Sequence, residues 1–136
     1  MNRIDKVAVC SRSFSKSLFL KETLLNKYQF VKFNDEGKSL QGETLIEFLK
    51  DETKVICGLE EFSKGILDEL PYLKVISKYG VGVDNLDLQA MAEKEIKLGW
   101  SPGVNKRSVS ELVLALSLSL LRYIPEANTD LKQGHW

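Results

Sequence analysis

The sequence has 136 residues, of which 43% are hydrophobic and 28% charged, a composition typical of one globular domain. Its 19 basic residues balance 19 acidic ones, which argues against recruitment by nucleic acid or by an acidic membrane surface. The longest apolar stretch, residues 112–121, is shorter than the ~20 residues that span a bilayer, and the N-terminus lacks a signal-peptide pattern. We therefore expect a soluble, cytoplasmic protein that binds neither nucleic acid nor membrane.

Two cysteines, Cys10 and Cys57, lie far apart in the sequence, each inside a short apolar run. This placement is typical of small hydrophobic side chains in a protein interior. The alternative is a disulfide or a metal-binding pair, for which the spacing offers no pattern. We therefore predict two buried, reduced thiols and no metal site.

Short apolar runs alternate with helical patterns along the chain. The predicted strands cover residues 7–10, 30–33, 55–57, 73–77 and 96–98. The predicted helices cover residues 15–28, 44–50, 63–70, 87–94 and 108–123. Ser15, Ser63 and Asp87 are the expected caps of the first, third and fourth helices. Such alternation with short connections predicts an α/β fold: a flavodoxin-like, five-stranded parallel sheet in the order 2-1-3-4-5, with helices on both faces, that ends in a long helix.

The loop after the fourth strand, residues 78–85, is the first candidate for a binding site. Ligands of parallel sheets bind outside the carboxyl ends of the strands, where this loop begins. Gly80 and Gly82 allow the backbone to turn successive amides toward one point, which suits a carboxylate or a phosphate. A dinucleotide-binding loop would need a third glycine where Asn85 stands, so a tight turn without a ligand is the alternative.

The loop after the fifth strand is the second candidate. It places the amide of Asn105 beside two cations, Lys106 and Arg107. The alternative for this loop is a solvated helix start that is capped by Ser108.

Three stretches together form a recognisable set. They are LKVISKYGVGVDNLDL at residues 73–88, SPGVNKRSVSEL at residues 101–112 and LKQGHW at residues 131–136. The first resembles the signature loop of the D-isomer-specific 2-hydroxyacid dehydrogenases, close to phosphoglycerate dehydrogenase. The second is similar to the family's crossover into a long inter-domain helix, and the third to the Gly-x-Trp that closes this crossover. The resemblance covers nearly the whole chain and is strongest from Leu73 onward. Because both long loops occur in the family's order and spacing, it is far more specific than either loop alone.

The resemblance implies a site for a small 2-hydroxy or 2-oxo acid. In the family, backbone amides at the positions of Val81 and Gly82 hold the substrate carboxylate, and an Asn at the position of Asn105 contacts substrate in some members. Lys78 stands where phosphoglycerate dehydrogenases often carry an Arg near the substrate phosphate, and a second Arg expected after the third strand is replaced by residues 58–60, Gly-Leu-Glu. Lys lacks the bidentate fork of Arg, so a different 2-hydroxy acid is the expected substrate.

The resemblance further implies NAD or NADP as the cofactor of the intact enzyme, with Val81, Lys106 and Val109 on its nicotinamide side. Residues 1–104 correspond to the substrate-binding domain and residues 105–136 to the inter-domain crossover helix. The family's NAD-binding domain and its catalytic Arg, Glu and His lie beyond the residues present, and His135 matches no catalytic position. No catalytic residue is therefore expected in this chain, which alone should be inert and bind no cofactor tightly.

The principal hypothesis is an N-terminal fragment of an NAD-dependent oxidoreductase that acts on the CH–OH group of a D-2-hydroxy acid. The alternative is a free-standing anion-binding or dimerisation module. A phosphoacceptor signalling domain of similar fold is excluded, because residues 11–13 are Ser-Arg-Ser where acidic side chains would be needed, and the third strand ends at Cys57 in place of an Asp. The helix at 108–123 is apolar on nearly every side, which predicts a homodimer held by this helix.

Overall fold

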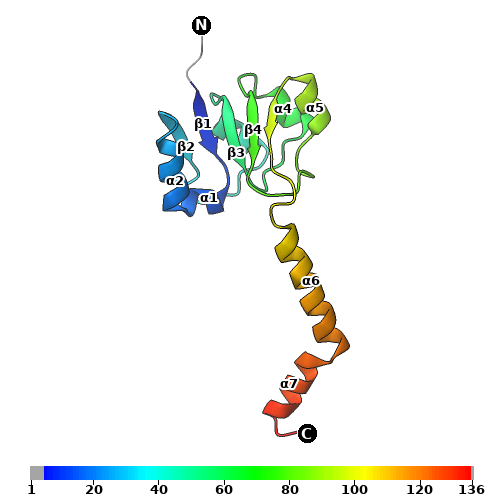
Figure 1. Cartoon of the computed structure of the whole chain (residues 1–136). Helices are drawn as coiled ribbons and strands as arrows, with labels where there is room; N and C mark the ends of the chain where they lie inside the picture. Colours follow the sequence, from blue (N-terminus) through cyan, green and yellow to red (C-terminus); the bar gives the residue numbers. More distant parts are fainter. Residues whose placement is uncertain (1–4, 136) are drawn as a thin grey trace. The chain divides into compact units, whose positions relative to one another are not determined.

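Five short parallel strands form one sheet in the structure, a computed structural model that describes residues 5–135 (Figure 1). The strands are β1 (Lys6–Val9), β2 (Phe30–Phe33), β3 (Lys54–Cys57), β4 (Val75–Lys78) and β5 (Lys97–Gly99). Their order across the sheet is β2-β1-β3-β4-β5, and every neighbouring pair is parallel. The predicted flavodoxin-like sheet is therefore confirmed.

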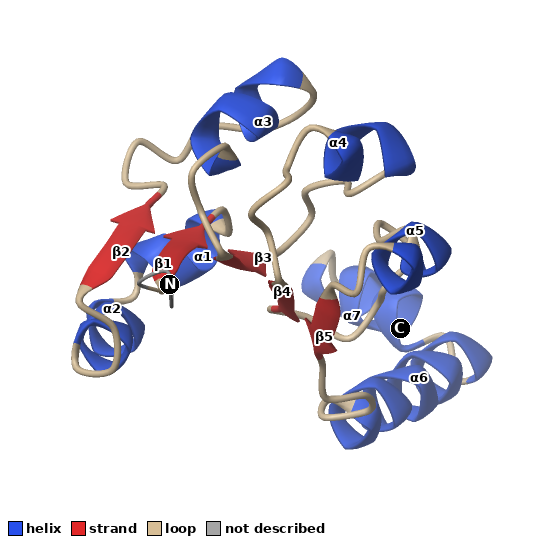
Figure 2. Ribbon diagram, turned by 90° about the horizontal axis from the view of Figure 1, so that it is seen from above, coloured by secondary structure: helices blue, strands red, loops and turns tan. Residues whose placement is uncertain are grey.

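Helices lie on both faces of this sheet, as predicted. Those that follow strands β1 to β4 are α1 (Arg12–Lys16), α2 (Leu18–Leu25), α3 (Glu43–Leu49), α4 (Lys64–Asp68) and α5 (Leu88–Glu93). Figure 2 shows α3, α4 and α5 along one face of the sheet and α2 on the opposite face, near β2. The right-handed crossovers of parallel strands place helices in this way.

The core lies where alternate strand residues meet the helices. Ala8, Val55 and Ile76 are neighbours in register across β1, β3 and β4, and none is more than 1% exposed. Because strand side chains alternate between faces, this row points to one side of the sheet. The same cluster includes the helical side chains Leu45, Leu49, Leu67, Ala90 and Met91. Burying each large aliphatic side chain contributes roughly 1.5–3 kcal/mol.

Both cysteines belong to this core, and both are free thiols, as predicted. Burial raises the pKa of Cys57 to about 12 and raises the pKa of Cys10 still further. At neutral pH both side chains are therefore protonated and pack as small apolar groups.

The first helical segment differs from the prediction, because one expected helix at 15–28 is two helices. The backbone is extended at Ser17, whose hydroxyl accepts a hydrogen bond from Leu20 N at 3.4 Å and caps α2. Ser11 caps α1 in the same way through Phe14 N. The predicted cap Ser15 is wrong: it lies inside α1, is buried, and its hydroxyl accepts from Asn34 N at 3.2 Å.

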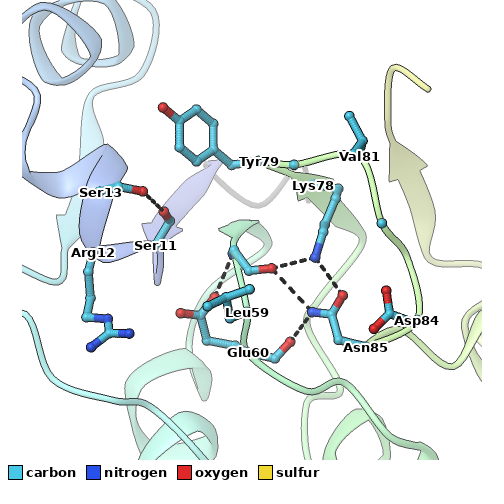
Figure 3. A pocket seen from close by; sticks show the side chains of 13 residues that line it. Ser11, Arg12, Ser13, Leu59, Glu60, Lys78, Tyr79, Val81, Asp84 and Asn85 are labelled. Atoms are coloured by element: carbon cyan, nitrogen blue, oxygen red, sulfur yellow. Dashed lines mark hydrogen bonds between the residues drawn. The ribbon is translucent and has the colours of Figure 1, made fainter. Parts of the chain in front are cut away.

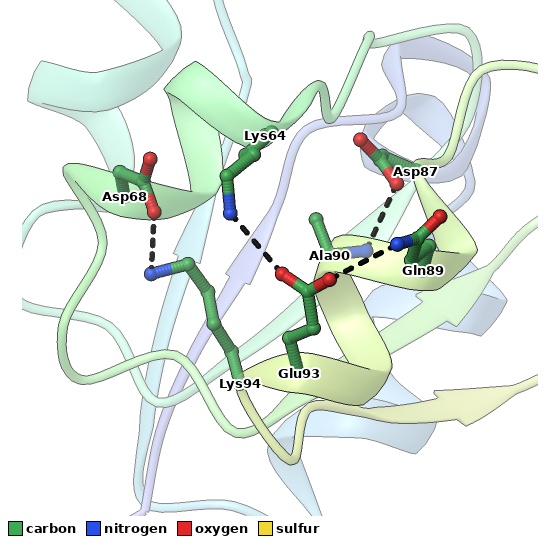
Figure 4. Close-up of polar contacts among 7 residues, drawn as sticks. All are labelled: Lys64, Asp68, Asp87, Gln89, Ala90, Glu93 and Lys94. Atoms are coloured by element: carbon green, nitrogen blue, oxygen red, sulfur yellow. Dashed lines mark hydrogen bonds and ion pairs between the residues drawn. The ribbon is translucent and has the colours of Figure 1, made fainter.

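The next caps follow the sequence more closely. The Asp87 carboxylate accepts from Ala90 N at 2.9 Å and begins α5, as predicted. Ser63 is the residue before α4 but makes no side-chain cap bond. Figure 4 shows how α4 and α5 are joined on the surface by two ion pairs, Lys64–Glu93 at 3.2 Å and Lys94–Asp68 at 2.7 Å. Exposed pairs of this kind contribute little to stability.

The described chain divides after Pro102 into two compact units, of which the second begins at Gly103. It contains α6 (Lys106–Leu121) and α7 (Ile124–Lys132). The long helix begins two residues before its predicted start, and Asn105, not Ser108, is its N-cap residue. Tyr123 has a left-handed backbone with φ 53° and separates the two helices, with Pro125 in the first turn of α7.

No single helix within residues 5–135 has both the length and the apolar composition of a membrane span; α6 and α7 meet these criteria only as a pair, bent by 58°. Two sequence-based expectations involve residues outside those that the structure describes. One is the expectation that the N-terminus, which includes residues 1–4, has no signal-peptide pattern. The other is the Gly-x-Trp of the closing segment, which ends at Trp136.

Candidate functional site

A pocket of about 560 Å³ opens at the carboxyl ends of β1, β3 and β4 (Figure 3). Three loops form its walls, one from each strand. The lining residues are Ser11, Arg12, Ser13, Gly58, Leu59, Glu60, Lys78, Tyr79, Gly80, Val81, Gly82, Asp84 and Asn85. The pocket therefore lies where parallel sheets place their ligands, and it contains the predicted loop after β4.

The loop after β4 presents a row of unused backbone donors. From Gly80 to Asn85, the amide N–H groups donate to no acceptor within residues 5–135. Gly80 has φ 152°, which only glycine adopts readily. At Gly82 a Cβ atom would lie 2.8 Å from Asp84 Oδ1, so a side chain there would displace the carboxylate. Gly80 is thus required by its backbone conformation, whereas a side chain at Gly82 would have to move the flexible Asp84 carboxylate. A row of free amides can form an anion-binding nest.

Lys78 lies at the centre of the pocket and is held by two oxygen atoms. Its Nζ donates to Gly58 O at 2.5 Å and to Asn85 Oδ1 at 2.6 Å (Figure 3). The Asn85 amide in turn donates to Glu60 O at 2.5 Å. These bonds tie the loop after β3 to the loop after β4. The ammonium has three N–H donors, so one is left for a ligand.

The loop after β3 places the carboxylate of Glu60 at the pocket wall, where the resemblance implied an Arg. Glu60 is 8% exposed, and its Oε2 accepts from Gly58 N at 2.6 Å. Leu59 is 84% exposed at the rim of the same wall. A negatively charged or bulky polar substituent of a ligand would therefore find no cation on this side.

The loop after β1 supplies the third wall and a cation that the sequence analysis did not single out. The hydroxyl oxygens of Ser11 and Ser13 lie 3.2 Å apart. Arg12 lines the pocket and is exposed, and its guanidinium makes no hydrogen bond or ion pair with any residue the structure describes. Its position directly after β1 was the only sequence signal for Arg12 as a pocket residue. That this loop meets the loops after β3 and β4 depends on the tertiary fold.

One further contact escaped the sequence analysis. Trp100, directly after β5, donates from Nε1 to Val81 O at 3.1 Å. Tyr79, the residue before Gly80, packs edge-on against Phe14 with ring centroids 5.4 Å apart. The Gly-Val-Gly segment thus follows one aromatic residue and accepts a hydrogen bond from a second.

The structure brings together Lys78, Val81 and Gly82 of the predicted site residues. The predicted residues Asn105, Lys106 and Val109 belong to the second unit, where Asn105 precedes α6 and the other two lie in its first turn. Within the described residues there is no group of three His, Cys, Asp or Glu side chains arranged to hold a metal ion.

Comparison with known proteins identifies a family. Residues 7–133 match the family described as D-isomer specific 2-hydroxyacid dehydrogenase, catalytic domain. Among the curated relatives, D-3-phosphoglycerate dehydrogenase of Methanocaldococcus jannaschii is 38% identical over 98 residues, which cover 71% of this chain and 19% of the relative. Hydroxypyruvate reductase of Thermotoga maritima is 35% identical over 102 residues, which cover 75% of this chain and 31% of the relative. The chain thus spans a fifth to a third of the length of these relatives.

Solved structures agree at the level of the fold. NAD-dependent formate dehydrogenase from Staphylococcus aureus has a TM-score of 0.67 at 24% identity, over 98% of this chain and 43% of that one. D-2-hydroxyisocaproate dehydrogenase has a TM-score of 0.71 at 20% identity, over 96% of this chain and 39% of that one.

Proposed function

Because the chain belongs to the D-isomer-specific 2-hydroxyacid dehydrogenase family, we propose that it is the substrate-binding N-terminal part of an NAD- or NADP-dependent dehydrogenase. The intact enzyme would interconvert the CH–OH group of a D-2-hydroxy acid and the corresponding 2-oxo acid. The observation that carries this proposal is the row of free amides from Gly80 to Asn85, which opens into a pocket at the strand ends.

In this proposal the amides of Val81 and Gly82 bind the substrate carboxylate. Backbone N–H donors suit a carboxylate because they supply directional hydrogen bonds without a competing negative charge. The free N–H of Lys78 adds a positive charge nearby, and the bonds to Gly58 and Asn85 keep that charge in place. The chain's own residues thus bind and orient the acid.

Besides the groups that bind and orient the carboxylate, oxidation of a 2-hydroxy acid requires a base for the hydroxyl proton. In the resembling family this base is a histidine. None of the residues that line the pocket is a histidine. His135, the only histidine in the sequence, belongs to the second unit. We therefore assign no catalytic residue within this chain.

The residues present do not fit a complete site for NAD or NADP. A dinucleotide pyrophosphate is normally held by a Gly-x-Gly-x-x-Gly turn at a helix N-terminus. The loop after β4 has two of these glycines, but Asn85 occupies the third position and its side chain is bonded to Lys78 and Glu60. In the intact enzyme NAD or NADP would supply the hydride-transfer chemistry. Contacts of Val81 in the first unit, and of Lys106 and Val109 in the second, with its nicotinamide side remain predictions from the resemblance.

The proposed substrates are small 2-hydroxy and 2-oxo acids. Phosphoglycerate is less favoured, because Leu59 and Glu60 stand where the resemblance implies an Arg, and Lys78 lacks the bidentate fork of the Arg that the resemblance implies at its position. We further propose a homodimer, because eight apolar side chains of α6 are 50% to 74% exposed. They are Val109, Leu112, Val113, Leu114, Leu116, Leu118, Leu120 and Leu121.

Nuclear magnetic resonance of the full chain tests the carboxylate site. Titration with D-lactate is expected to shift the amide resonances of residues 80–85 before any others, with weak affinity. Lactamide, which has the same hydroxyl but no charge, is the matched control and should leave them unchanged. Shifts confined to other parts of the chain would refute the site.

A further inference from the structure

Trp100 touches the binding loop from outside the pocket. Its indole Nε1 donates to the Val81 carbonyl oxygen at 3.1 Å, and the side chain is 42% exposed. Val81 lines the pocket, whereas Trp100 is absent from the lining residues. The observed link between Trp100 and the pocket is therefore its hydrogen bond to the Val81 backbone.

Because Val81 C=O and Gly82 N–H belong to one peptide unit, the hydrogen bond from Trp100 also fixes the direction of the Gly82 N–H. In a trans peptide unit the C=O and the N–H point to opposite sides, and none of the described peptide bonds is cis. With Val81 O held by Trp100, the N–H of Gly82 points away from the indole.

Such a peptide needs a lock. Gly80 and Gly82 flank Val81, and glycine has access to conformations on both sides of the backbone map. A Gly-x-Gly segment can therefore rotate its peptide planes at little cost. The amide of Gly82 has no acceptor among residues 5–135 that would fix it from within.

The indole selects one of the two orientations. Its N–H is a donor only, so it binds a carbonyl oxygen and cannot bind an amide N–H. A peptide turned by 180° would lose the bond to Trp100 and present Gly82 N–H to the indole. The contact thus stabilises only the orientation that is observed.

We propose that Trp100 is a positioning residue for the anion-binding loop, holding the Val81–Gly82 peptide so that Gly82 N–H faces the pocket. The inference rests on the proposed carboxylate site and adds the residue that orients one of its donors. A donor oriented in advance binds an anion more tightly than one that must turn on binding.

The test removes the indole N–H and keeps the ring. In the full chain, the indole of Trp100 is replaced by benzothiophene, which has the same shape and no N–H, and Trp100→Phe is made as a second variant. Trp136→Phe, at the only other tryptophan in the sequence, is the matched control. Two quantities are measured: the Gly82 amide resonance without ligand, and the dissociation constant for D-lactate.

The benzothiophene chain is expected to shift or broaden the Gly82 resonance without ligand. Loss of one neutral hydrogen bond should weaken D-lactate binding about three- to tenfold. Trp136→Phe should change neither quantity. If Trp100→Phe unfolds the chain, the benzothiophene chain still decides the matter.

Two outcomes separate this inference from the proposed function. If D-lactate shifts residues 80–85 in the unmodified chain, and the benzothiophene chain binds equally well with an unchanged Gly82 resonance, the positioning role is wrong and the carboxylate site stands. If D-lactate shifts none of residues 80–85 in the unmodified chain, the carboxylate site and the role of Trp100 are both overturned.

Discussion

Apolar side chains are buried in the interior of the first unit but exposed on the surface of α6. In the sheet, Ile76 and its neighbours in register are almost fully covered. Along α6, leucines of the same apolar character are more than half exposed. In the core, moreover, each buried side-chain nitrogen and oxygen of the described residues has a hydrogen-bond partner. The first unit therefore buries its own apolar side chains, whereas the apolar side chains of α6 are not covered by the described residues.

This difference motivates the two binding surfaces that we propose for the chain. Two parts of the chain carry groups without an intramolecular partner among the described residues. One is the exposed apolar surface of α6, and the other is the pocket, with its free backbone amides and the Arg12 guanidinium. Large exposed apolar surfaces mark interaction sites, and converging free donors mark ligand sites. We therefore propose a protein surface as the partner of α6 and an anion as the ligand of the pocket.

The largest expected effect comes from breaking the completed interior. Ile76→Ala removes a fully buried side chain and should lower the free energy of unfolding by about 2–5 kcal/mol. Leu118→Ala on α6, in the second unit, should change the unfolding of the first unit by less than about 0.5 kcal/mol, even where it weakens the proposed dimer. Urea unfolding followed by Trp100 fluorescence, in a Trp136→Phe background, measures both. Equal losses would mean that α6 belongs to the same core.

The next effect concerns the incomplete surface. Leu116→Glu with Leu120→Glu places two charges on the apolar face of α6, and burying them in an interface would be costly. We expect the chain to change from a dimer to a monomer of 15.4 kDa. Light scattering measures the mass. Ser117→Glu adds a charge to the same helix at a polar position and should leave the dimer intact. A monomer for the unmodified chain would contradict the proposed dimer.

The sheet was predictable because its signals are local. Short apolar runs separated by turns and capped helices specify each strand and crossover within a few residues, and Asp87 caps α5 as the sequence indicates. The split of the first helix was not predicted, because Ser11, Ser15 and Ser17 are equally good caps by type. Their roles differ through tertiary contacts: Ser15 is turned inward to Asn34.

The site was predictable only in part, for the same reason. Gly80 and Gly82 predict the backbone donors, because glycine allows backbone conformations that turn successive amides in unusual directions. By contrast, the bond from Lys78 to Gly58 and the bond from Trp100 to Val81 join residues 20 and 19 positions apart. No spacing rule links such pairs, because strand order and loop closure bring them together.

A smaller effect tests how completely the interior of the first unit excludes water. Cys10 and Cys57 have an ordinary pKa near 9.0, and burial raises the pKa of Cys57 to about 12 and that of Cys10 further. Above pH 9 the unfolded chain therefore loses thiol protons that the folded chain keeps. The free energy of unfolding should then fall as pH rises, by about 1.4 kcal/mol per pH unit for each thiol.

Urea unfolding at pH 8, 9 and 10 measures this dependence. The double variant Cys10→Ala with Cys57→Ala is the control, because it retains every other titrating group. It should be less stable than the unmodified chain at pH 8 but show a flatter loss of stability above pH 9. Identical slopes for the two chains would show that the buried thiols do not control the alkaline transition.

The smallest expected effect distinguishes the two cations of the pocket. Lys78 is engaged by Gly58 and Asn85, whereas Arg12 has no partner among the described residues. A 2-hydroxy acid bound by its carboxylate at Gly82 would direct a second anionic group toward the remaining cation, so Arg12→Gln should weaken binding of D-malate. An exposed charge pair contributes up to about 1 kcal/mol, which corresponds to a loss of up to about fivefold.

The same variant should leave D-lactate binding within about twofold, because D-lactate has no second charge to lose. Lys16→Gln is the matched control, since it removes one charge from the same helix at a position outside the pocket. Chemical-shift titrations at low and high salt measure the dissociation constants of both acids for the unmodified chain and for the two variants. The difference between the two acids should shrink at high salt, where exposed charges are screened. If Arg12→Gln and Lys16→Gln weaken D-malate equally, the effect reflects net charge, and the wall formed by the loop after β1 does not read the substrate.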